Sequence, residues 1–146
     1  MSTTPQEPKI ITLNQYVGPH RSSPDWTPER EQNATRLLAA CCALEVEMAR
    51  GGVSFPDNPS TKNGVSGETF GGFRPQTCPI GAPNSAHKEG LAVDRYDPAG
   101  LIDAWCMAHI DRIEKHGIYI EHPSATLGWS HWATRAPKSG NRVFFP

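Results

Sequence analysis

The sequence has no long hydrophobic run, no excess of one charge and no leader-like start. Its longest apolar stretch, residues 37–44, is followed by Glu45 and is too short to cross a bilayer. The first residues contain no apolar run preceded by lysine or arginine, so no secretory signal peptide is predicted. The formal net charge is −1 and the basic residues form no stripe, which disfavours a nucleic-acid partner. We therefore expect synthesis in the cytoplasm and no binding to membranes or nucleic acids.

Cysteine is also scarce. The four cysteines, Cys41, Cys42, Cys78 and Cys106, include an adjacent pair but no C-x-x-C spacing. Cys41 and Cys106 fall on the apolar faces of expected helices, which predicts buried free thiols. A disulfide framework and a cysteine-bound zinc are both disfavoured.

Glycine and proline, in contrast, are abundant, with 13 and 14 residues in a chain of 146. This length suits one domain with one hydrophobic core, and the composition favours a loop-rich α+β fold. We expect a single domain over residues 1–146. It should contain a small, mainly antiparallel sheet with helices packed against it, and residues 1–9 should form a flexible tail.

Capping residues and hydrophobic periodicity place the expected elements. Thr27-Pro28-Glu29 begins a long amphipathic helix that ends at Gly51-Gly52. Asp97-Pro98 begins a second helix that ends at His116-Gly117. Strands are expected over residues 10–16 (a strand or an arm), 65–73, 91–96, 118–121, 129–132 and 142–145.

Two histidines and one aspartate carry the strongest chemical signal. His87 lies in a turn and Asp94 in the strand that follows, with Gly90 between them, where a positive φ would let both side chains meet. His131 lies in the middle of a later strand, which could be a neighbour of the first. Two imidazoles and one carboxylate suit a zinc ion whose fourth tetrahedral position stays open, as in catalytic sites.

A zinc hydrolase also needs a base and groups that hold its substrate. Glu121, at the end of the strand before His131, is the candidate base, and a solvated strand end explains its position equally well. Arg74 precedes a proline-stiffened loop and suits either a two-pronged grip on a substrate carboxylate or a surface salt bridge. His122 shares the hairpin with His131 and is a candidate substrate contact. Trp129 either packs the sheet or forms a wall of the cleft.

Three segments together resemble the zinc D-alanyl-D-alanine carboxypeptidase and dipeptidase family. These LAS-type murein peptidases include phage endolysins that cut the stem peptides of bacterial cell walls, and they share their fold with the hedgehog signalling domain. The resemblance covers residues 27–146. Its segments read Phe73-Arg74, Ser85-x-His87-x-x-Gly90-x-Ala92-x-Asp94 and Trp129-x-His131.

The resemblance implies a site and a function. His87, Asp94 and His131 would hold Zn²⁺ in an open cleft, Arg74 would steer the substrate, and Ser85 would support the site. The activity implied is cleavage of the peptidoglycan stem peptide by an endolysin or a virion-associated lysin. Such a protein is made in the host cytoplasm and acts at the cell wall after release, or as part of a virion beside other virion proteins.

One position departs from the family pattern. Many members carry an acid, the catalytic base, three residues before the last histidine, where this chain has Gly128. The base is then supplied by Glu121 or is missing. The hedgehog domain shows that this scaffold and its zinc can serve binding instead of hydrolysis. The alternative expectation is therefore a catalytically inactive zinc-binding domain that acts as a structural or binding module of a phage particle.

Overall fold

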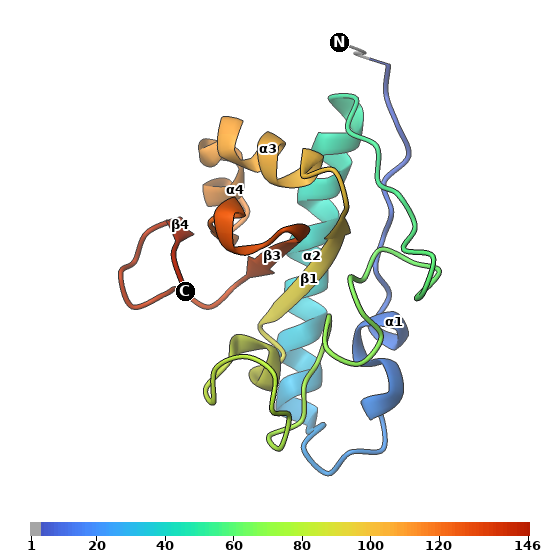
Figure 1. Cartoon of the computed structure of the whole chain (residues 1–146), viewed down its shortest axis with the longest axis vertical. Helices are drawn as coiled ribbons and strands as arrows, with labels where there is room; N and C mark the ends of the chain where they lie inside the picture. The colour runs from blue at the N-terminus through green and yellow to red at the C-terminus, as the bar shows by residue number, and fades with distance from the viewer. Residues whose placement is uncertain (1–3) are drawn as a thin grey trace.

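The computed structural model describes residues 4–146, arranged around one long central helix (Figure 1). This helix is α2 (Pro28–Arg50). The short helix α1 (Leu13–Val17) lies beside its N-terminal half, and α3 (Leu101–Ala108) and α4 (Ile110–Lys115) lie near its C-terminal end (Figure 1). The first strand of the sheet, residues 92–97, crosses the middle of α2 (Figure 1).

Four strands form one sheet in the order β1-β3-β2-β4. The first, β1 (Ala92–Asp97), pairs antiparallel with β3 (Gly128–Ala133), and β3 pairs antiparallel with β2 (Tyr119–Glu121). At the edge, β4 (Val143–Phe144) runs parallel to β2. The predicted small, mainly antiparallel sheet with accompanying helices is therefore confirmed.

One face of the sheet packs against α2. Val93 of β1 and Trp132 of β3 are almost fully buried in the same core as Leu37 of the helix. Because successive side chains of a strand point to opposite faces, the neighbouring Asp94 and His131 project from the other face. The core therefore fixes the two strands and leaves their polar residues on the opposite side.

The central helix begins and ends where the sequence predicts. Thr27 accepts a hydrogen bond from the Arg30 backbone N–H over 3.3 Å, Pro28 occupies the first helical position, and Gly51 follows the last one. Within residues 4–146, none of the helices combines the length and the apolar character needed to cross a membrane.

The cysteines are free, and Cys41 and Cys106 are buried, as predicted. Burial raises the pKa of both thiols. Both therefore stay protonated and act as small apolar core residues.

For residues 10–16 the sequence predicts a strand or an arm, and the strand is wrong, because α1 begins at Leu13. The Thr12 hydroxyl accepts from the Gln15 N–H over 3.2 Å, and the Gln15 side chain accepts from the Thr12 N–H over 3.0 Å. This reciprocal capping box stabilises a helical turn and overrides the β-propensity of the neighbouring residues.

Residues 1–9 are predicted as a tail, of which residues 1–3 lie outside the described part. The Gln6 N–H donates to the Ala49 carbonyl oxygen over 2.7 Å, and the Lys9 carbonyl oxygen accepts from Arg95. The rest of this segment is thus bonded to α2 and to β1.

The predicted strand over residues 65–73 is also wrong. It forms a loop with one isolated bridge, between Val65 and Arg95. The loop passes so close to α1 that a Cβ at Gly72 would lie 1.9 Å from the Tyr16 carbonyl oxygen. Its glycines therefore serve a close backbone approach and not a strand.

The second predicted helix, residues 97–116, is divided into α3 and α4 at His109, whose φ is −134°. The helix also begins later than expected, because Asp97 still belongs to β1. The two Asp97 carboxylate oxygens accept hydrogen bonds from the N–H groups of Ile102 and Asp103, each over 3.0 Å. Asp97 therefore caps α3 from the end of the strand.

Candidate metal centre

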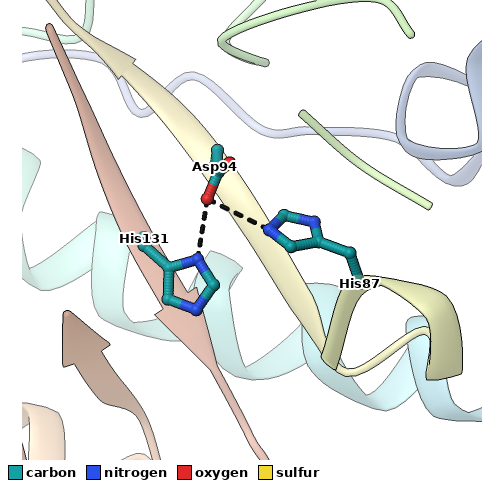
Figure 2. A group of neighbouring side chains, drawn as sticks. All are labelled: His87, Asp94 and His131. Atoms are coloured by element: carbon teal, nitrogen blue, oxygen red, sulfur yellow. Dashed lines mark hydrogen bonds and ion pairs between the residues drawn. The ribbon is translucent and has the colours of Figure 1, made fainter. Parts of the chain in front are cut away.

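Three side chains from three different elements converge on one point (Figure 2). His87 belongs to the 3-10 turn Ala86–Glu89, Asp94 to β1 and His131 to β3. One ligand atom from each lies within 4.8 Å of the others. Asp94 and His131 are direct partners in the β1–β3 ladder, so the register of the sheet sets their separation. The three predicted metal ligands are thus brought together.

The turn that carries His87 depends on its two ends. The Ser85 hydroxyl accepts from the His87 N–H over 3.3 Å and caps the turn. Gly90 closes it with a φ of +74°, and a Cβ there would lie 2.5 Å from the Arg30 carbonyl oxygen. The positive φ predicted for Gly90 is confirmed. The role that the resemblance implies for Ser85, support of the site, stays a prediction.

The contacts of His87 determine which ring nitrogen is protonated. Its Nδ1 lies 2.8 Å from the Gly72 carbonyl oxygen, which can only accept, so Nδ1 carries the hydrogen. Burial lowers the pKa of His87 despite the nearby Asp94 carboxylate, so the ring is neutral at pH 7. The Nε2 lone pair then faces the Asp94 Oδ1 atom at 3.2 Å. Two acceptors at this distance repel each other unless a cation lies between them.

Asp94 supplies the shared oxygen of the cluster. Its Oδ1 lies 2.8 Å from His131 Nδ1, and its Oδ2 accepts from Arg74 Nη2 over 3.2 Å. Burial alone would raise the pKa of Asp94, but the facing histidines hold it below its usual range, so the carboxylate is ionised. Arg74 fixes one carboxylate oxygen and turns the other toward the two imidazoles.

The distances suit a bound ion. Metal–ligand bonds of 2.0–2.2 Å in a tetrahedron place two ligand atoms about 3.3–3.6 Å apart. The Asp94 Oδ1 atom lies 3.2 Å from His87 Nε2 and 2.8 Å from His131 Nδ1, and the three ligand atoms all lie within 4.8 Å of one another. The His-Asp-His group could therefore hold a metal ion.

This group lines a cavity of about 680 Å³, a size typical of small-ligand sites. Two segments supply most of the other lining residues, namely Ile80, Gly81, Ala82, Asn84 and Ala86 before β1, and Ala133, Arg135, Ala136, Pro137 and Lys138 at and after the end of β3. The residues that the sequence analysis proposed for the site and that line this cavity are His87, Asp94, His131, Glu121, Arg74, Ser85 and Trp129.

His122 is the predicted site residue that the structure does not bring to the cavity. Its Nδ1 lies 2.8 Å from the Ser124 hydroxyl, and its ring stacks on Phe145 with a centroid separation of 4.4 Å. His122 follows Glu121 directly, so alternation turns it away from the face that carries the metal ligands.

Glu121 lies on the same face as the metal ligands. The β2–β3 register pairs Ile120 with Trp132, which places the next residue, Glu121, opposite His131. Asp94, His131 and Glu121 thus form a row across three adjacent strands. Burial raises the pKa of Glu121, and the nearby negative charge of Asp94 adds to this effect. A carboxyl with a raised pKa beside a metal site is suited to accept and return a proton.

No protein-family model, curated protein or solved structure matches this chain. A functional assignment must therefore come from the chemistry of the site and from the sequence motifs.

Arg74 is a buried residue of this site and not a surface salt bridge. Its Nε donates to the Phe70 carbonyl oxygen over 2.7 Å, its Nη1 to the Ile80 carbonyl oxygen over 3.4 Å, and its Nη2 to Asp94. A Cβ at Gly81 would lie 2.6 Å from Nη1. A guanidinium has five N–H donors, so about two are not engaged by these three contacts.

The segment that follows β3 also belongs to the site, although its residues were not predicted to. Arg135 and Lys138 line the cavity from this segment, and Phe144 of β4 lines it beside them. The available signal was two basic residues, spaced by three, in a proline-containing loop directly after the strand of His131.

Proposed function

We propose that the chain is a zinc-dependent peptidase that cleaves the stem peptide of bacterial peptidoglycan, as phage endolysins or virion-associated lysins of the LAS type do. The observation that carries this proposal is the row of Asp94, His131 and Glu121 on one sheet face, with His87 completing the metal group beside a cavity. The sequence motifs supply the substrate class. In this proposal the protein is made in the host cytoplasm and acts at the cell wall.

Zinc is the metal that these donors favour. Two imidazole nitrogens and one carboxylate oxygen are a common catalytic zinc set, whereas structural zinc uses four protein ligands. The group contains three such residues and faces a cavity, which leaves room for a fourth ligand that is not protein. When bound, Zn²⁺ would polarise the scissile carbonyl and stabilise the negative charge that develops on its oxygen.

The residues of the chain would divide the remaining work. The Glu121 carboxylate takes a proton from the attacking water and returns it to the amine of the leaving fragment. The free N–H groups of Arg74 hold a carboxylate of the substrate, while its Nη2 keeps Asp94 oriented. Ser85 holds the turn of His87, and Trp129 forms a wall of the cavity.

One observation favours a second function, a catalytically inactive zinc module of a phage particle. Gly128, which stands where related enzymes carry their acid, is exposed and has a φ of +92°. In this alternative, zinc fastens β3 to the turn of His87, and the domain binds other virion proteins. The placement of Glu121 beside His131 favours the peptidase.

The test is release of free amines from purified peptidoglycan by the zinc-loaded protein. We expect Glu121→Gln to retain zinc and to lose about 10²–10⁴-fold in rate, because the proton acceptor is removed. Glu114→Gln makes the same chemical change on α4, outside the residues that line the cavity, and should keep the parental rate. Mass analysis of the products would identify the bond cut.

Each other outcome has a defined meaning. Equal cleavage by the parent and by Glu121→Gln would keep the peptidase and remove Glu121 from its role. If the zinc-loaded parent cleaves none of several chemically different peptidoglycans, the peptidase proposal fails and the binding module becomes the favoured function.

A further inference from the structure

The cavity has a basic end that the proposed catalysis does not use. Arg135 and Lys138 are exposed residues of the segment after β3, and both line the cavity. The Nη2 of Arg135 donates to the Asn84 carbonyl oxygen over 2.8 Å, which links the two sides of the cavity. Within residues 4–146, no hydrogen bond or ion pair engages the Lys138 ammonium.

The charges around the cavity are unequal. Asp94 and Glu121 are its acidic side chains, and Arg74, Arg135 and Lys138 its permanently basic ones. Asp94 already contacts Arg74 and both histidines, so its charge is compensated where it stands. Arg135 and Lys138 have no acidic partner in the described residues. A concave site lined by unpaired cations attracts anionic ligands.

The next basic residue of the segment, Arg142, does not share the surroundings of Lys138. Arg142 donates from Nη1 to the Ile118 carbonyl oxygen over 3.1 Å, and its guanidinium lies 4.0 Å from the centroid of the Tyr119 ring. It does not line the cavity. Basic residues of one short segment thus have different surroundings, and Lys138 is the one that faces the cavity without a partner.

We propose that Lys138, with Arg135 bracing the wall beside it, binds a second carboxylate of the substrate. This inference rests on the proposed function and narrows its substrate class. Arg74 holds one carboxylate near the metal group, and Lys138 holds another at the basic end. The preferred stem peptide therefore carries a free carboxylate away from the scissile bond, where other stem peptides carry a carboxamide.

The experiment uses two synthetic stem peptides that differ at one group. One has the D-glutamate α-carboxylate free, and the other has it as the carboxamide. Hydrolysis (kcat/KM) and equilibrium binding by calorimetry are measured on the zinc-loaded full chain. We expect kcat/KM and affinity of the parent to be about fivefold higher for the carboxylate peptide, because an exposed ion pair of good geometry contributes about that factor. This preference should disappear as salt is added, because salt screens the attraction.

Three variants locate the effect. Lys138→Gln should remove the preference and Lys138→Glu should reverse it. Lys115→Gln makes the same loss of charge at an exposed position on α4 that does not line the cavity, and should keep the parental preference.

The outcomes separate the two proposals. Hydrolysis of both peptides at equal rates by the parent overturns the second carboxylate site and leaves the peptidase intact. The parent could bind the carboxylate peptide preferentially but hydrolyse neither peptide. If Lys138→Gln then abolishes this binding preference, the second carboxylate site is supported and the peptidase proposal is overturned. A preference that persists in both Lys138 variants overturns the assignment to Lys138, and absence of binding and hydrolysis overturns both proposals.

Discussion

At the scale of single residues, Asp94 organises the site. Its Oδ1 faces both imidazoles and its Oδ2 accepts from Arg74, so three side chains share one carboxylate. The two histidines and Asp94 could be predicted because their spacing in a turn and two strands fixes where they point. The contact between Arg74 and Asp94 could not be predicted, since the loop that carries Arg74 has no hydrophobic periodicity that would indicate its path.

The same scale yields a prediction for Glu121. In the metal-free protein, NMR should show this carboxyl titrating above the ordinary value of 4.5, because burial and the Asp94 charge raise its pKa. Adding zinc should move the titration to lower pH, because a nearby positive charge favours the carboxylate. The spectrum of Glu121→Gln assigns the signal. A titration that zinc leaves unmoved would place Glu121 away from the metal.

At the scale of elements, β1 links the site to the central helix. Arg95 follows Asp94 and points to the opposite face, where it is buried against Glu45 of α2 and the Lys9 carbonyl oxygen. The helix α2 could be predicted because its caps and its apolar stripe agree. The loop over residues 65–73 could not be predicted, because its glycines are needed for a close approach to α1, which is distant in sequence.

This link predicts a large effect for Glu45→Ala on stability. The change leaves the Arg95 guanidinium buried without its charged partner, which should cost about 3–5 kcal/mol in the free energy of unfolding. Urea denaturation would measure the loss. Combining it with Arg95→Met should recover much of the stability, since the unpaired charge is then removed as well. A double variant as unstable as the sum of the two single variants would contradict a direct pairing.

At the scale of the whole molecule, the metal group joins parts of the chain that are far apart in sequence. The 3-10 turn, β1 and β3 each supply one ligand, so an ion bound there would fasten the turn to the sheet. The small antiparallel sheet and the helices could be predicted from composition and pattern. A strand at the position of β4 was predicted, but its parallel pairing with β2 and the basic residues Arg135 and Lys138 at the cavity could not be, because they depend on how the last segment folds back over the sheet.

Zinc should therefore raise the thermal stability of metal-free protein. At a concentration about 100-fold above its Kd, a ligand of the folded state adds about 2.7 kcal/mol. For a chain of this length, that corresponds to a Tm increase of about 5–10 °C. His131→Ala should abolish most of the increase, and Mg²⁺, which prefers oxygen ligands, should give none. An equal increase in His131→Ala would place the bound zinc elsewhere.

The position of Pro146 has a practical consequence for measurements of metal binding. Pro146 and Phe144 both line the cavity that the metal group faces. A polyhistidine tag joined after Pro146 would begin at this cavity and offer its own imidazoles to the same ion. Measurements of metal content or affinity should therefore use a tag that is placed before the first residue or removed by a protease.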